Sequence, residues 1–208
     1  NKAPKGKSTG NFSIQQGRKS VKIEVPIHNL SPGNIKGFVE SNHYIAIEAA
    51  NYSEKGNDEQ GWTFVPNLGK TGSTMTAFAK TPTHGEWSED NPYLEYDFHN
   101  FSTGEIKIEF LLSPTLDFHN KGGLRFAYSI DDKEPQIINL HQDTKDDWGT
   151  SVGNNITRVT SELNFEEKGN HTLKIWAIDS GIALQKIIIR KGEIGESYLG
   201  PPESKTAK

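Results

Sequence analysis

The chain of 208 residues contains no cysteine, which excludes disulfide bonds, cysteine-ligated zinc, iron–sulfur clusters and a thiol nucleophile. It also has no run of roughly 18 apolar residues, so the sequence predicts no membrane-spanning helix. The net charge of −4 disfavours nucleic acid as a partner, because that binding depends on neutralising phosphates. Aromatic residues, in contrast, make up 10% of the chain, and this proportion indicates a packed core.

Both ends of the chain are poor in apolar residues. Residues 1–19 are rich in Gly, Ser, Lys and Asn, which predicts a flexible arm or linker. Residues 201–208 are predicted to form a tail of the same kind. The chain begins with Asn rather than Met and shows no apolar signal core, so we interpret it as an excised fragment or a mature form.

Between the ends, short apolar runs alternate with turn sequences about every 8–15 residues. Only residues 146–161 suggest a helix, and Gly149 and Gly153 weaken that prediction. Regularly spaced strands without helices, and without an internal repeat, indicate an all-β protein with a β-sandwich or barrel fold. The predicted strands are Val21–Val25, Tyr44–Ala49, Tyr93–Phe98, Glu105–Leu112, Leu124–Ile130, Gln136–Leu140, Asn170–Ala177 and Ala183–Ile189.

The sequence gives little support for catalysis or for metal binding. Seven histidines are scattered without a Gly-x-Ser-x-Gly elbow or a His-Glu-x-x-His motif. The 27 Asp and Glu residues make chance carboxylate pairs abundant, so they do not indicate a glycosidase site. Oxygen ligands for calcium are available at Glu48, at Asp131-Asp132 and at Asp146-Asp147, but solvated turns are the simpler interpretation of these pairs.

The four tryptophans carry more information. Trp176 lies in an alternating apolar run, which predicts that it is part of the core. Trp62, Trp87 and Trp148 follow polar loop sequences, and a tryptophan there either plugs the end of a sandwich or binds a ligand. An indole ring can stack on the apolar face of a sugar while neighbouring polar groups bind its hydroxyls.

A series of segments, in order, resembles one known family. They run from Tyr44–Tyr52 through the Gly61–Ser73 block to Tyr198–Ser204. The matching segments between them are Tyr93–Asp97, Leu112–Leu116, Gly123–Ala127, Asp147-Trp148, His171–Trp176 and Leu184–Ile187. Over residues 36–204 the chain is similar to the C-terminal domain of glycoside hydrolase family 115, the xylan α-1,2-glucuronidases.

The resemblance implies a jelly-roll β-sandwich like those of carbohydrate-binding modules, over residues 36–200. It implies that residues 20–35 connect this sandwich to a preceding domain, and that the catalytic carboxylates belong to other domains. Related sandwiches often hold a structural calcium with a Glu-Ala-Glu strand. Here the strand has Glu48-Ala49-Ala50, which weakens the case for calcium, and we expect no cofactor.

We therefore expect a non-catalytic carbohydrate-binding module of a secreted, periplasmic or cell-surface bacterial enzyme that degrades hemicellulose. The expected ligand is xylan or glucuronoxylan. Trp87, Trp148 or Trp62 would stack on a sugar, and Arg125, Asp147 or Asn154 would bind hydroxyls or, for Arg125, a uronate. The alternative is a structural domain that completes the parent enzyme or a homodimer and binds no sugar itself.

Overall fold

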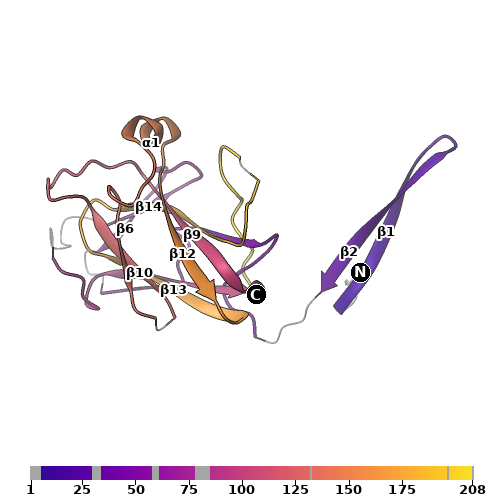
Figure 1. Ribbon diagram of the computed structural model, residues 1–208, viewed down its shortest axis with the longest axis horizontal. Coiled ribbons are helices and arrows are strands. Elements are labelled where there is room, and N and C mark those ends of the chain that lie inside the picture. Colours follow the sequence, from indigo (N-terminus) through magenta and orange to yellow (C-terminus); the bar gives the residue numbers. More distant parts are fainter. Residues whose placement is uncertain are drawn as a thin grey trace. The chain divides into compact units, whose positions relative to one another are not determined.

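The computed structural model describes residues 6–29, 34–57, 61–77, 85–131, 133–195 and 197–207. The chain divides into two compact units, Asn1–Ile35 and Lys36–Lys208 (Figure 1). In the described part of the chain, no helix has the length and apolar character needed to cross a membrane.

The first unit is a β-hairpin. Strand β1 (Gly6–Gln16) pairs antiparallel with β2 (Lys19–Asn29) along its whole length, and Gly17 makes the turn with a φ of 59°. Over residues 6–19 the structure therefore differs from the prediction of a flexible arm, while residues 1–5 lie outside the described residues. The high content of Gly, Ser and Asn favoured the prediction of a flexible segment, although Phe12 and Ile14 are two residues apart and lie on the same side of the strand.

The second unit is a sandwich of two six-stranded sheets, which confirms the predicted all-β fold of the jelly-roll, carbohydrate-binding-module-like type (Figure 1). The first sheet, here the β8 sheet, has the order β11-β10-β13-β8-β3, with β5 also paired to β8. Its strands are β3 (Phe38–Val39), β5 (Glu54–Gly56), β8 (Tyr93–Asn100), β10 (Arg125–Ile130), β11 (Gln136–Asn139) and β13 (Gly169–Ala177).

The second sheet, here the β14 sheet, has the order β12-β9-β14-β7-β6, with β4 also paired to β14. Its strands are β4 (Tyr44–Glu48), β6 (Trp62–Val65), β7 (Thr74–Ala77), β9 (Gly104–Leu112), β12 (Thr157–Phe165) and β14 (Ala183–Arg190). The described segments contain a single helix, α1 (Trp148–Asn154). The helix predicted from residue 146 to 161 thus ends early, and its second part begins β12.

The main core lies between the two sheets. The ring centroid of Phe110, on β9, is 5.0 Å from those of both Phe126 and Tyr128 on β10. Tyr96 is fully buried and donates a hydrogen bond from its hydroxyl to the Ala49 carbonyl, at 2.8 Å. Burial raises the pKa of this phenol well above its ordinary value, so the phenol stays neutral.

The C-terminal segment is not the loose tail that the sequence predicts. Ser204 N–H donates to the Ala46 carbonyl at 2.8 Å, and Val39 N–H donates to the Lys205 carbonyl at 2.9 Å. The Glu203 carboxylate accepts from Glu48 N–H at 2.9 Å. The last residues thereby join β3 to β4, at the edges of the two sheets.

Candidate functional site

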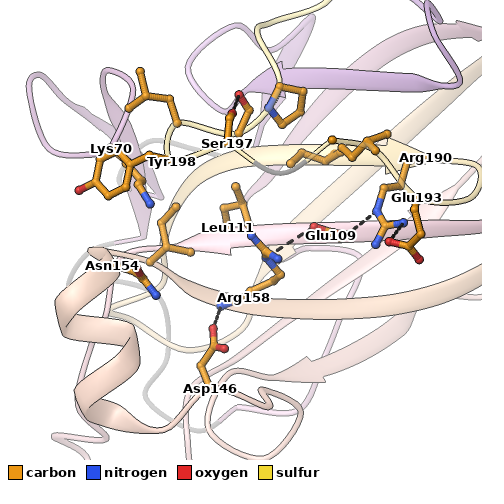
Figure 2. A pocket seen from close by; sticks show the side chains of 17 residues that line it. Lys70, Glu109, Leu111, Asp146, Asn154, Arg158, Arg190, Glu193, Ser197 and Tyr198 are labelled. Atoms are coloured by element: carbon orange, nitrogen blue, oxygen red, sulfur yellow. Dashed lines mark hydrogen bonds and ion pairs between the residues drawn. The ribbon is translucent and has the colours of Figure 1, made fainter.

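The outer face of the β14 sheet, which points away from the core, carries a hollow of about 510 Å³ (Figure 2). Its floor is a small apolar cluster of Leu111 from β9, Ile156 before β12 and Ile188 from β14, with Ile194 packed against them. The wall opposite α1 is formed by the C-terminal segments 193–195 and 197–201. The volume falls in the range of about 300–1,000 Å³ that is typical of small-molecule sites.

A buried carboxylate organises one end of the hollow. The Glu109 side chain on β9 is only 5% exposed, and its Oε1 lies 2.6 Å from Arg190 Nε of β14. Its Oε2 lies 3.5 Å from Arg158 Nε of β12, so it sits between two guanidinium groups (Figure 2). Arg158 remains half exposed and reaches the open part of the hollow.

The other end holds a lysine and a tyrosine. The ammonium nitrogen of Lys70 lies 3.8 Å from the ring centroid of Tyr198, a cation–π contact (Figure 2). Tyr198 is 69% exposed, so most of its ring surface faces solvent. Partial desolvation, and secondly the positive charge of Arg158, lower the pKa of the Lys70 ammonium from its ordinary value. Two cations thus influence one another across a hollow that an anion could enter.

Gln185 of β14 fixes the positions of the elements around the hollow. It is buried, and its Oε1 accepts from Lys70 N–H at 2.8 Å. Its amide group donates to Ser113 Oγ at 3.0 Å and to the Asn155 carbonyl at 2.9 Å. One side chain therefore holds the Lys70 loop, the end of β9 and the C-terminal end of α1 together.

Helix α1 presents a polar and an apolar side near the hollow. Asp147 caps it, accepting from Thr150 N–H at 2.9 Å and from Thr150 Oγ at 2.8 Å. These hydrogen bonds lower the pKa of the Asp147 carboxyl. Asn154 lines the hollow, whereas Trp148 is 50% exposed at the start of the helix.

The predicted site residues are only partly brought together. Asn154 borders the hollow, and Asp147 and Trp148 lie on the same short helix. Asp147 is engaged as a helix cap, so the structure gives its carboxylate a local role.

Trp62 is the first of three predicted residues that the structure places elsewhere. It is 1% exposed in the main core, and its Nε1 donates to the Pro92 carbonyl at 3.2 Å. The prediction that Trp62 stacks on a sugar is therefore wrong, since the strand β6 turns its indole between the sheets.

Trp87 and Arg125 belong to the β8 sheet. Trp87 packs edge to face on Trp176, with ring centroids 5.9 Å apart, and this pair covers the outer face of that sheet. Trp176 is buried as predicted, though outside the core between the sheets. Arg125 binds the fully buried Asp179, with Nε 2.8 Å from Oδ2, and donates from Nη2 to the Gly85 carbonyl. Its role is thus the neutralisation of Asp179.

The residues proposed from sequence as calcium ligands already have protein partners. Glu48 lies 2.9 Å from the nearly buried ammonium of Lys186 and accepts from Thr71 Oγ1 at 2.8 Å. Asp131 accepts from Thr172 N–H, and Asp146 accepts from Arg158 N–H. Asp132 lies outside the described residues. Within the described part of the chain, no cluster of His, Asp and Glu side chains could hold a metal ion.

Sequence reasoning missed Lys70, Arg158 and Tyr198. Thr157, Val159 and Phe165 are buried and the residues next to them are more exposed, which is the alternation of a strand. A strand predicted here would have placed Arg158 on the outer face of its sheet. Lys70 and Tyr198 lie on loops far apart in the sequence, and no pattern in the sequence relates them.

Comparison with known proteins decides the family. Residues 37–203 match the family described as Glycosyl hydrolase family 115 C-terminal domain. The chain belongs to this family. No curated protein sequence matches it.

Among solved structures, the family 115 domain is similar to the 4-O-methyl-α-glucuronidase BtGH115A, described as specific for decorated arabinogalactans. The identity is 20% and the TM-score is 0.58; the match covers 74% of this chain and 18% of that one. The chain is also similar to the family 6 carbohydrate-binding module of LamC from Zobellia galactanivorans, with 18% identity and a TM-score of 0.48. That match covers 71% of this chain and 99% of the module. For the family 35 module of Abf62 from Cellvibrio japonicus the identity is 12% and the TM-score is 0.45, and the match covers 72% of this chain and 94% of the module.

Proposed function

We propose that this family 115 domain is a non-catalytic carbohydrate-binding module of a xylan-degrading enzyme, and that it binds glucuronoxylan. The observation that carries the proposal is the hollow on the β14 sheet, which combines an exposed aromatic ring with two cations. Tyr198 supplies the ring, and Lys70 and Arg158 supply the charges. An aromatic face binds a sugar ring, and a guanidinium or ammonium group binds a carboxylate.

The proposed contacts follow from the positions of the side chains. The Tyr198 ring stacks on one sugar face, with Lys70 beneath the ring. Arg158, whose side chain is half exposed, pairs with the uronate. Asn154, at the end of α1, donates to sugar hydroxyls, and Trp148 offers a second stacking face at the start of that helix.

Open sites of this kind bind weakly. We expect a dissociation constant on the order of 0.1–1 mM, because a shallow hollow encloses only part of a polysaccharide. The electrostatic part of the affinity should decrease with added salt, since the cations are partly exposed.

The test is affinity electrophoresis of the protein in native gels that contain glucuronoxylan, arabinoxylan or a cellulose derivative. We expect retardation on the xylans, strongest on glucuronoxylan. Tyr198→Ala should lower retention about tenfold, and Lys70→Gln, which removes one of the two positive charges and keeps Arg158, should reduce the preference for glucuronoxylan. The matched controls are Tyr52→Ala and Lys168→Gln, at exposed positions outside the hollow. Retention that is unchanged in both hollow variants would show that the site is assigned incorrectly.

A purely structural domain is the second candidate. The partly apolar hollow and the exposed Leu199 beside it could instead face another domain of a parent enzyme. In that case no gel would retard the protein, and Leu199→Ser would improve its solubility. This outcome would indicate that the domain serves in assembly of the parent enzyme and not in sugar binding.

A further inference from the structure

One face of the hairpin of β1 and β2 carries a continuous apolar patch. In an antiparallel pair, directly opposed residues point to the same side of the ribbon. The register pairs Phe12 with Ile23 and Ile14 with Val21, and it also places Val25 and Ile27 on this face. The same side also carries Ser8 and Gly10 between these residues, and Gln16 and Lys19 beside the turn. The opposite face is mainly polar, with Lys7, Thr9, Asn11, Ser13, Gln15, Ser20, Lys22 and Glu24, and it includes Pro26. The six residues Phe12, Ile14, Val21, Ile23, Val25 and Ile27 are called the hairpin face below.

The hairpin face is not covered by any other described element of its own unit. Val21 is 62% exposed, Ile14 58% and Phe12 52%. A two-stranded ribbon is at best marginally stable in water, and it requires packing on one face to persist. An exposed apolar patch of this length therefore indicates a partner surface.

The chemistry of the partner follows from the face. The charged residue of this side, Lys19, lies at the turn end of the hairpin, so the surface that contacts the six apolar residues is itself apolar. The polar residues of the other face are suited to solvent. The hairpin is consequently the outermost layer of whatever it packs against.

Two hairpins stacked face to face do not provide enough area for a stable dimer. Two strands of 11 residues form a ribbon roughly 36 Å long and about 10 Å wide. Two such faces packed together would bury roughly 700 Å² in total. Specific interfaces bury about 1,200–2,000 Å², so stacked hairpins alone are too small for a stable dimer.

The family match indicates where a larger surface is found. It begins at residue 37, so the hairpin lies before the C-terminal domain and outside it. The chain corresponds to only 18% of the length of the similar glucuronidase. We propose that the hairpin face docks on an apolar surface of the domain that precedes it in a longer glycoside hydrolase chain. The hairpin then completes that domain rather than the sandwich.

The first part of the test uses the 208-residue chain alone. Analytical ultracentrifugation at up to about 100 μM should show a monomer. Hydrogen–deuterium exchange should show fast exchange across residues 6–29, at least about 100-fold faster than for β9 and β14. A dimer that the double variant Phe12→Lys, Val21→Lys abolishes would overturn the proposal in favour of a second copy. Slow exchange of the hairpin in a monomer would overturn it in favour of the chain's own sandwich.

The second part uses the encoded full-length protein. There the hairpin amides should be protected about 100-fold or more relative to the 208-residue chain. The double variant Phe12→Lys, Val21→Lys should lose this protection. The control variant Asn11→Lys, Ser20→Lys, which adds the same charge to the polar face, should keep it. Equal exchange in both proteins, or a full-length protein without a preceding domain, would overturn the proposal. None of these readouts depends on sugar binding, which the gels measure separately.

Discussion

The Lys70 ammonium illustrates how one side chain can serve in both structure and recognition. Its backbone N–H is held by Gln185, while its ammonium lies over the Tyr198 ring. Desolvation and the positive charge of Arg158 both favour the neutral amine of Lys70, so the charged form of Lys70 is destabilised in the free protein. A bound uronate would reverse that balance by supplying an opposite charge.

Binding of glucuronoxylan should therefore depend on pH. The pKa of Lys70 in the free protein lies below 10.5, and a bound anion raises it. Retention should be constant at neutral pH and should fall as the pH rises through the Lys70 pKa. Lys70→Arg keeps its charge in this range and should show no fall. Gel retardation on glucuronoxylan and on neutral arabinoxylan measures the effect, and an equal fall on both polysaccharides would contradict this explanation.

Residue environments were the least predictable part of the protein. Trp62 and Trp148 both follow polar sequence, yet one is 1% exposed and the other 50%. The difference arises from pairing: Trp62 is opposite Ala77 on β7, which directs it between the sheets. Trp148 begins helix α1, and Asp147 before it is a helix cap that can be read from the sequence. The orientation of the helix, in contrast, depends on strands that are distant in the sequence.

At the scale of elements, the hollow depends on three segments that meet only in the folded chain. These are the Lys70 loop, helix α1 and the segment after β14. Gln185 contacts the first two and lies on the strand that leads to the third. It is thus a positioning residue for the proposed site.

Gln185→Leu should disturb both the stability and the site. The substitution keeps the approximate volume but leaves Lys70 N–H, Ser113 Oγ and the Asn155 carbonyl without this partner. We expect a loss of about 1–3 kcal/mol in the free energy of unfolding. Urea denaturation measures it, with Gln142→Leu as a control that removes one exposed hydrogen bond to the Gly122 carbonyl and should cost less than about 1 kcal/mol. Equal effects of the two substitutions would contradict the role of Gln185.

Strands with a clear period of two were predictable, and those hidden by composition were not. Glu105–Leu112 and Ala183–Ile189 correspond closely to β9 and β14, because their apolar residues alternate or run continuously in the core. Strand β1 was missed because glycine, serine and asparagine separate its apolar residues. Strand β12 was missed because the preceding helix signal extended into it.

At the scale of the whole molecule, the sandwich unit is closed by its own ends. Phe38 forms a bridge with Thr206, and Ala207 N–H donates to the Gly37 carbonyl at 2.9 Å. The Glu203 carboxylate adds bonds to Glu48 N–H and to Asn51 Nδ2, each at 2.9 Å. The polar sequence of the C-terminal segment gave no indication that this segment pairs with residues near the start of the sandwich.

Removal of residues 203–208 should therefore destabilise the sandwich. It deletes several backbone and side-chain hydrogen bonds, each with a net value of about 0.5–1.5 kcal/mol. We expect a loss of roughly 2–5 kcal/mol by urea denaturation. The double variant Lys205→Ala, Thr206→Ala keeps the backbone bonds and should be nearly neutral. A truncated protein with unchanged stability would show that these bonds do not contribute.

The pairing of Phe38 with Thr206 also has an architectural consequence. Because the sandwich is entered and left at one place, it can be inserted into a loop of another protein without separating the two sides of that loop. The same adjacency permits a circular permutation, in which a short linker joins the ends and a new start is opened at a surface turn. Closely spaced ends thus make this unit suited to insertion and to permutation.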